Sequence, residues 1–153
     1  MQAIRTAARA LIIQNENLLT IKMKDANGIF YILPGGGQNH GETLKKSLER
    51  EVFEEVGAEI SVGKLAYVRE YIGKNHGFRK SHHSFHQLES VFFCSLKSSP
   101  EIEKAHNPDN KQIGVEWIPI AKISDYKILP EILNSFIQDI HLKENDLYLG
   151  DIN

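Results

Sequence analysis

Residues 36–58 read GGQNHGETLKKSLEREVFEEVGA, a glycine turn followed by a helical segment that ends at a second glycine. Glu51, Glu54 and Glu55 have i, i+3 and i+4 spacing, which places them on one face of that helix. Unpaired like charges this close repel one another and lower the stability of a helix. The stretch therefore predicts a site for a divalent metal ion that serves phosphate chemistry.

The helix is predicted from apolar residues that recur at every fourth position, namely Leu44, Leu48, Val52 and Val56. Thr43 suits the N-cap, and Gly57 suits the residue that follows the last turn. The acidic face borders the apolar stripe. We therefore expect the carboxylates to lie half sheltered at the rim of the core.

The elements around this helix are predicted from apolar runs bounded by turn residues. Strands are expected over residues 3–13, 18–23, 29–33, 59–71, 85–96 and 113–118, and a second helix over 129–140. Gly35–Gly37 is expected to be a turn. Strands followed by a helix, more strands and a final helix predict an α+β fold, with a mixed β-sheet that carries a helix on each face.

The composition is that of a globular protein, with 153 residues, 41% hydrophobic and 25% charged. This length predicts one domain spanning residues 1–153. A formal net charge of -2 argues against stable binding of nucleic acid. The sequence contains no convincing signal peptide, no membrane-spanning run and a single cysteine, which excludes an internal disulfide. A cytoplasmic location is the default expectation.

The chemistry expected of this stretch follows from its donor atoms. Three carboxylates supply hard oxygen ligands, which suit Mg²⁺ or Mn²⁺. Glycines let the backbone approach a ligand closely. We therefore place Gly36 with the metal ion and Gly37 with the substrate.

The pattern of this stretch resembles the signature of the Nudix hydrolases. It consists of Gly36, five residues, Glu42, seven residues, and then REVFEEVGA over residues 50–58. The Pro34–Gly37 lead-in is also typical of that family. The signature covers about a sixth of the chain, and the remaining strands and the second helix fit the family's αβα sandwich.

The resemblance implies hydrolysis of a nucleoside diphosphate linked to another moiety, with Mg²⁺ or Mn²⁺ as cofactor. It implies that Glu51, Glu54 and Glu55 bind the metal, and that Arg50 pairs with and orients glutamate. Glu42 corresponds to the glutamate that steadies the loop before the helix. Family members often dimerise, so a homodimer is also expected.

The sequence departs from the family pattern at two positions. Ala58 stands where a larger aliphatic residue is usual, which indicates a packing change. Asn39 stands where many members have an acid, which removes one extra metal ligand.

Several residues outside the signature are candidates for further roles. Arg5 and Arg9 share one face of the first strand and are either substrate contacts or surface ion pairs. Asp109 and Glu116 are the positional candidates for a general base. The histidine-rich segment from His76 to His86 either lines the substrate pocket or is exposed, and its spacing fits no common zinc site.

Two functions remain to be compared. The first is a metal-dependent pyrophosphohydrolase that uses Glu54, Glu51 and Arg50 in catalysis on a small nucleotide. The alternative is a non-catalytic module that binds a nucleotide or metabolite, for which a damaged acidic set would be expected. The signature leaves the substrate open among nucleoside triphosphates, ADP-ribose or another nucleotide sugar, and dinucleoside polyphosphates.

Overall fold

The structure is a computed structural model that describes residues 2–76, 80–104, 111–139 and 147–153. The strands within these residues are β1 (Arg5–Gln14), β2 (Asn17–Asp25), β3 (Gly28–Ile32), β4 (Gly35–Gly37), β5 (Ile60–Ile72), β6 (His86–Leu96), β7 (Gln112–Pro119) and β8 (Tyr148–Asp151). The helices are α1 (Leu44–Val56) and α2 (Ile132–Gln138), with short 3-10 helices η1 (Gly73–Asn75), η2 (Lys80–His82), η3 (Ile102–Lys104) and η4 (Ile120–Asp125).

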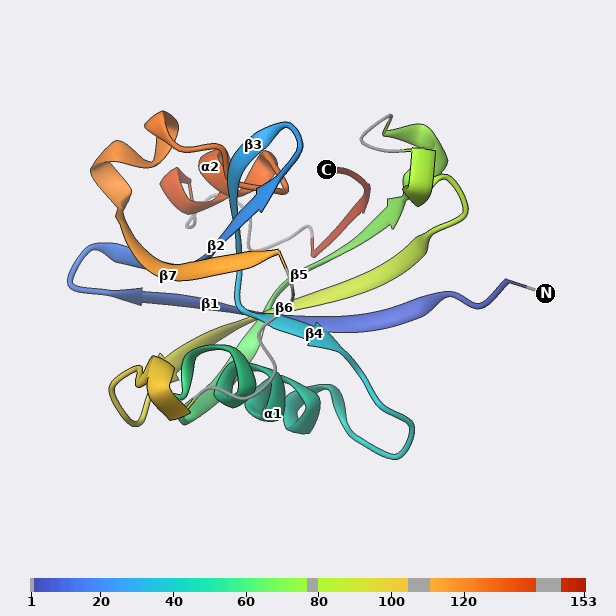
Figure 1. Cartoon of the computed structure of the whole chain (residues 1–153). Helices are drawn as coiled ribbons and strands as arrows, with labels where there is room; N and C mark the ends of the chain where they lie inside the picture. Colours follow the sequence, from blue (N-terminus) through green and yellow to red (C-terminus); the bar gives the residue numbers. More distant parts are fainter. Residues whose placement is uncertain (1, 77–79, 105–110, 140–146) are drawn as a thin grey trace.

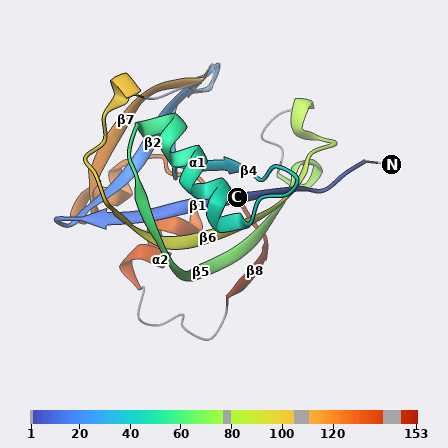
Figure 2. The ribbon, with the colours of Figure 1, turned by 90° about the horizontal axis from the view of Figure 1, so that it is seen from below.

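The described strands form one mixed sheet of eight strands between two helices. Its main order is β3-β2-β1-β6-β5-β8, while β4 pairs with β1 and β7 pairs with β2. The β1–β6 and β5–β8 pairs are parallel, and the other pairs are antiparallel. Helix α1 lies on one side of the central strands and α2 on the other (Figure 1). Seen from below, α1 lies in front of β1 and β6 (Figure 2). The predicted α+β sandwich is therefore confirmed.

Strand β1 explains why the sheet has two buried faces, because successive side chains of a strand point to opposite faces. Ala8, Ala10 and Ile12 pack in one core cluster with the apolar stripe of α1. Leu11 packs in a second cluster with the apolar residues of α2. The alternation thus places α1 and α2 on opposite faces of the same strand.

The first hairpin confirms the polar turn implied by the sequence around residues 14–17. Gln14 pairs with Asn17, and the two residues between them, Asn15 and Glu16, have φ values of 50° and 61°. Positive φ at both central positions matches the right-handed twist of the flanking strands.

The expected turn at Gly35–Gly37 is wrong, because these residues form strand β4. They pair antiparallel with β1 in the register Ala7–Gly37, Ala8–Gly36 and Arg9–Gly35. The amide of Ala10 also donates to the carbonyl of Pro34 at 2.8 Å. The edge of β1 offers unpaired backbone groups, and these hydrogen bonds hold the glycines in an extended conformation.

The second helix is shorter than predicted, and β8 was not predicted. Leu129 donates its backbone N–H to the carbonyl of Tyr31 at 2.9 Å, so the chain before Pro130 is held against β3 instead of joining α2. Ile140, at the predicted end of this helix, lies outside the described residues. Strand β8 forms from a four-residue segment that pairs with the edge of β5. No helix in the described part of the chain is long and apolar enough to cross a membrane.

We predict that Gly35→Ala strongly destabilises the protein. Gly35 has a φ of 139°, and a Cβ atom at this position would lie 2.1 Å from the carbonyl oxygen of Ala8. The backbone of β1 cannot yield without losing its hydrogen bonds, so we expect a loss of about 3 kcal/mol in the free energy of unfolding. Urea unfolding followed by circular dichroism measures this loss.

Gly114→Ala in β7 is the matched control. A Cβ atom there meets nothing within 4 Å, so the substitution should change the free energy of unfolding by less than about 0.5 kcal/mol. Equal stabilities of the two variants would contradict the role assigned to Gly35.

Candidate active site

Helix α1 begins and ends as its sequence predicts. The Thr43 hydroxyl accepts the backbone N–H of Lys46 at 3.2 Å, which satisfies a donor in the first turn. At the other end, Gly57 adopts a φ of 65° and donates its N–H to the carbonyl of Phe53 at 2.9 Å. These two ends fix which residues of the helix face the sheet and which lie at its rim.

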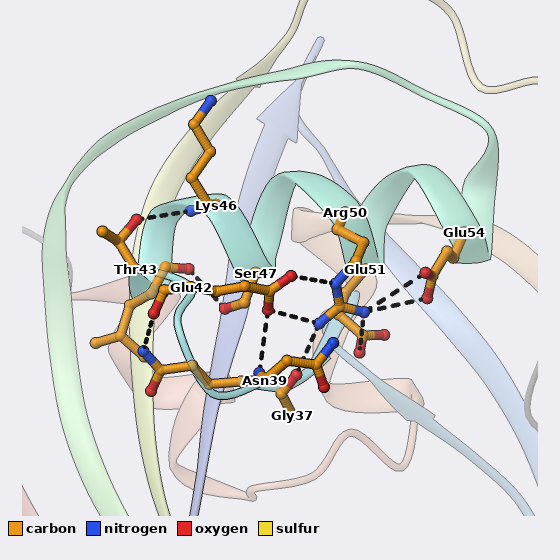
Figure 3. Close-up of polar contacts among 11 residues, drawn as sticks. Gly37, Asn39, Glu42, Thr43, Lys46, Ser47, Arg50, Glu51 and Glu54 are labelled. Carbon is orange, nitrogen blue, oxygen red and sulfur yellow. Dashed lines mark hydrogen bonds and ion pairs between the residues drawn. The ribbon is translucent and has the colours of Figure 1, made fainter.

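Arg50 connects the carboxylates of this region (Figure 3). Its Nε donates to Oε1 of Glu42 at 2.7 Å and its Nη2 to Oε2 of Glu42 at 3.0 Å. Its Nη1 contacts Glu51 at 3.0 Å and Glu54 at 3.4 Å. Nη2 also donates to the carbonyl of Gly37 at 3.0 Å. One guanidinium group therefore joins three carboxylates to the glycine strand, and a planar, five-donor group is suited to this task.

The charged groups of this cluster shift one another's pKa values. Hydrogen bonds to Glu42 raise the pKa of Arg50, outweighing the opposing effect of burial. The same Arg50 bonds lower the pKa of Glu42, and the backbone N–H of Asn39, at 3.0 Å, adds to this effect. Arg50 thus supplies part of the positive charge that the clustered glutamates require.

The other glutamates of the set contact β4. Glu55 is buried, and its Oε1 accepts the backbone N–H of Gly35 at 2.7 Å. The Glu51 carboxylate lies against Gly36, where a Cβ atom would come within 2.6 Å of Glu51 Cδ. Only a residue without a side chain leaves that space for the carboxylate.

The residues of this region fit a hard divalent cation in their donor chemistry. Glu51, Glu54 and Glu55 offer carboxylate oxygens from one helix, and Gly36 leaves the room beside them. In the described residues no three His, Cys, Asp or Glu side chains converge on a single metal position. Arg50 Nη1 lies between Glu51 and Glu54 and balances their charge in this arrangement.

A second charged cluster lies on the opposite face of the sheet. Glu89 of β6 accepts Nε of Arg9 at 3.2 Å and Nε of Arg69 at 2.9 Å. Burial by itself would raise the pKa of Glu89, but the two guanidinium groups hold it below its usual value. Arg9 also donates to the carbonyls of Leu33 and Gly35, at 3.2 and 2.8 Å. Gly35 is therefore held by Glu55 from one face and by Arg9 from the other.

Gln87 extends this cluster along β6. It donates to Oε2 of Glu89 at 2.9 Å and accepts Nη1 of Arg5 at 2.5 Å. The Arg5 guanidinium lies against Gly37, where a Cβ atom would be 2.7 Å from Arg5 Nη2. Beside these residues is a pocket of about 140 Å³, whose lining is Arg9, Ile32, Leu33, Arg69, Tyr71, His82, Gln87, Glu89, Leu129, Pro130 and Asn153.

The structure brings together most of the residues singled out from the sequence. The signature glutamates, Arg50, Gly36 and Gly37 meet on the α1 face, and the side chains of Arg5 and Arg9 reach the glycine strand from the other face. Glu116 is not brought to them. It forms an ion pair with Lys22 at 3.6 Å. Burial raises the pKa of Tyr31 and the nearby Glu116 carboxylate adds to this effect, and Tyr31 belongs to the α2-side cluster. Asp109 lies outside the described residues.

The histidine-rich segment is divided between two roles. His82 lines the pocket, as one of the two interpretations of this segment expected. His76 and His86 instead bind the carboxylates of Asp151 and Glu70, at 2.5 and 3.0 Å.

Glu89, Arg69 and Gln87 were not predicted from the sequence. The sequence does contain a signal for Arg69. Residues 67, 69 and 71 of β5 lie on the same buried face of the strand, and Arg69 is the charged residue among them. A charged residue on such a face requires a partner. That partner is Glu89, which lies directly opposite Arg69 in the antiparallel pair of β5 and β6.

Comparison with known proteins identifies relatives of this chain. The profile of the NUDIX domain matches residues 3–140. Nucleoside triphosphatase NudI of Enterobacter sp. (strain 638) is 36% identical over 61 residues, which are 38% of this chain and 43% of that relative. The matched region therefore spans less than half of the relative.

Solved structures share the fold. A NUDIX hydrolase from Nitrosomonas europaea has a TM-score of 0.73 at 19% identity, covering 91% of this chain and 89% of that one. An ADP-ribose pyrophosphatase from Streptococcus suis has a TM-score of 0.63 at 14% identity, covering 97% of this chain and 100% of that one.

We predict that Glu89→Gln lowers the free energy of unfolding by about 3 kcal/mol at neutral pH, because it leaves the buried Arg69 and the partly buried Arg9 without their counter-ion. The pKa of Glu89 is lowered in the folded state, so its contribution is present above the ordinary glutamate pKa of about 4.3 and is lost as the pH falls through the folded value. The difference between wild type and variant should therefore shrink below about pH 4.

Urea unfolding at a series of pH values tests this expectation. Glu59→Gln, at an exposed carboxylate that precedes β5, serves as the control and should leave stability nearly unchanged. A loss for Glu89→Gln that stays the same at all pH values would show that the effect is not electrostatic.

Proposed function

The chain belongs to the Nudix hydrolase family, and on this premise we propose that it hydrolyses a pyrophosphate bond in a nucleoside di- or triphosphate derivative. Water would attack a phosphorus atom of the phosphate chain. The family assignment rests on the domain match over residues 3–140. We further propose that residues 1–153 act as one domain on a small nucleotide.

The observation that carries the proposal is the Arg50 cluster beside the glycine strand. Arg50 holds Glu42, Glu51 and Glu54 within hydrogen-bond or ion-pair distance, and Gly37 and Gly36 lie next to them. A non-catalytic module has no need of a complete acidic set on one helical edge. The intact set therefore favours a hydrolase over the alternative of a binding module.

We propose Mg²⁺ or Mn²⁺ as the cofactor, held by Glu51, Glu54 and Glu55 with Gly36 beside them. Such an ion neutralises phosphate charge and lowers the pKa of bound water, which is the chemistry that attack on a pyrophosphate requires. Glu51 and Glu54 would release Arg50 Nη1 to take up this role. Arg50 can remain in place, because its other nitrogens are bound to Glu42 and Gly37.

Among the three glutamates, Glu54 is the residue that we assign most directly to catalysis. Its side chain is 29% exposed, compared with 20% for Glu51, and Glu55 is buried against Gly35. Glu54 is therefore the carboxylate most accessible to water and substrate. Arg50 is a positioning residue that orients Glu51 and Glu54. Glu116 receives no catalytic role, because its partners lie elsewhere.

The relatives do not select one substrate. Their names describe a nucleoside triphosphatase in one case and an ADP-ribose pyrophosphatase in another. Both names describe cleavage within a phosphate chain attached to a nucleoside. The names therefore support the class of reaction and do not identify the substrate. We expect the pocket on the opposite face of the sheet to determine which substrate is cleaved.

We predict that Glu54→Gln lowers kcat for nucleotide hydrolysis by about 100-fold or more in the presence of Mg²⁺, because an amide cannot bind the cation or take up a proton as a carboxylate does. Phosphate or pyrophosphate release from a panel of nucleoside triphosphates, ADP-ribose and dinucleoside polyphosphates measures this change.

Glu49→Gln is the matched control on the same helix. Glu49 pairs with Lys46 at 2.9 Å on the exposed side and does not contact Arg50 in the described structure. Its rates should equal those of wild type. Equal rates for Glu54→Gln and wild type would remove Glu54 from the catalytic set, and failure to cleave any member of the panel would remove the proposed function.

A further inference from the structure

The pocket on the α2-side face has a polar wall with an ordered set of hydrogen-bonding groups. Arg9 and Arg69 lie on either side of Glu89, at 3.2 and 2.9 Å, and all three line the pocket. The lining also includes the apolar residues Leu33, Leu129 and Pro130. A pocket lined by both charged and apolar side chains suits a flat ring with polar atoms on one edge better than a hydrated phosphate group.

The two guanidinium groups have donors that are not used within the described residues. Arg9 uses Nε and Nη1, and Arg69 uses Nε and Nη1, but Nη2 of each has no hydrogen-bond acceptor there. Among the described residues, only two fully buried side-chain polar atoms lack a hydrogen-bond partner, the Tyr67 hydroxyl and Gln112 Oε1. Both Nη2 atoms are therefore accessible, and each belongs to a residue that lines the pocket.

Glu89 retains one position for a donor. An ionised carboxylate offers about four acceptor positions, two on each oxygen. Arg9 and Gln87 occupy those of Oε2, while Arg69 occupies one of Oε1. In the strand order β1, β6 and β5, the residues that line the pocket thus carry a spare donor on Arg9, one acceptor position on Glu89 and a spare donor on Arg69.

Of the edges of the common nucleobases, one complements this order at all three positions. A pyrimidine with two carbonyl groups, such as uracil or thymine, presents an acceptor, an N–H donor and an acceptor. Guanine presents one acceptor and two donors, cytosine one donor and two acceptors, and adenine a donor beside an acceptor. A site built from fixed donors and acceptors rejects ligands that leave them unpaired.

The size of the pocket supports the same choice. Its volume is about 140 Å³. A cavity of about 150 Å³ holds a benzene molecule, which is one six-membered ring. The pocket therefore has room for one six-membered ring, the size of a pyrimidine base.

We propose that this pocket binds the base of the substrate and selects a pyrimidine with two carbonyl groups, so that the preferred substrates are uridine or thymidine nucleotides. The inference rests on the proposed function, since it assigns the base-binding part of the same site. Arg9 contributes to both faces, because its Nη1 holds the carbonyl of Gly35 beside the acidic cluster.

The residue directly after β8 holds Arg69 in the required orientation. The carbonyl of Ile152 accepts Arg69 Nη1 at 2.7 Å, while Nε is held by Glu89. Asp151 anchors this strand by accepting the backbone N–H of Ile72 at 2.9 Å and Nδ2 of Asn75 at 2.7 Å. With two nitrogens fixed, the plane of the guanidinium group is set, and Nη2 needs no rearrangement to meet a ligand.

Equilibrium binding of nucleoside monophosphates tests the proposal without catalysis. Isothermal titration of the whole chain with UMP, CMP, AMP and GMP in the presence of EDTA prevents any hydrolysis. We expect UMP to bind more tightly than each of the others by about tenfold or more. Comparable affinities for all four by the wild-type protein would overturn the proposal.

Two variants test whether the base is selected in this pocket. Arg69→Lys keeps the charge but loses the forked donor, so the preference for UMP over CMP should fall toward one. Leu129→Ala enlarges the pocket, so AMP should gain affinity relative to UMP. Ile120→Ala removes three carbons from apolar packing outside the pocket lining and should leave the ratio unchanged.

The outcomes separate this inference from the proposed function. An unchanged UMP preference in both Arg69→Lys and Leu129→Ala would show that the base binds elsewhere, and would overturn the inference while hydrolysis persists. A protein that binds UMP selectively but cleaves no nucleotide with Mg²⁺ would instead overturn the proposed function. The Leu129→Ala comparison remains decisive if Arg69→Lys fails to fold, because it predicts a gain of binding.

Discussion

The Arg50 cluster and the Glu89 cluster lie close together because the strand between them, β4 (Gly35–Gly37), has no side chains. Gly35 donates to Glu55 from one face, and its carbonyl accepts from Arg9 on the other. Side chains on Gly36 and Gly37 would collide with Glu51 and Arg5, respectively. Because β4 adds only backbone thickness, the acidic edge of α1 contacts all three glycines, and Arg9 and Arg5 reach Gly35 and Gly37 from the other face. A Cβ atom on Gly36 or Gly37 would displace a charged side chain of one cluster, and a Cβ atom on Gly35 would collide with the backbone of Ala8.

The two clusters have opposite balances of acidic and basic side chains. On the α1 face one arginine, Arg50, contacts three glutamates, so the cluster has excess negative charge and suits a cation. On the other face one glutamate, Glu89, contacts two arginines, which leaves donors for a ligand rich in acceptors. A nucleotide requires both, since its phosphates need positive charge supplied through a metal ion and its base needs directional hydrogen bonds.

Much of the α1 face could be predicted because its interactions are local in sequence. The spacing of Glu51, Glu54 and Glu55 places them on one edge of the helix, and Thr43 and Gly57 determine where that helix begins and ends. Arg50 reaches Glu54 within a single turn. The second face could not be predicted in the same way. Arg9, Arg69 and Glu89 come from three strands, and their contact depends on the register of β1 with β6 and of β6 with β5.

The sequence by itself determined the helix, its caps, its acidic edge and the alternation that gives β1 two buried faces, since these follow from the periodicities of the backbone over a few residues. The tertiary structure decided that the glycines form a strand instead of a turn, that Glu116 faces away from the acidic cluster, and that Ile152, directly after β8, holds Arg69 beside the pocket. Each of these outcomes depends on hydrogen bonds between residues far apart in the chain. Such bonds form only where a neighbouring strand or carbonyl offers an unpaired group, and no local pattern records where that group lies.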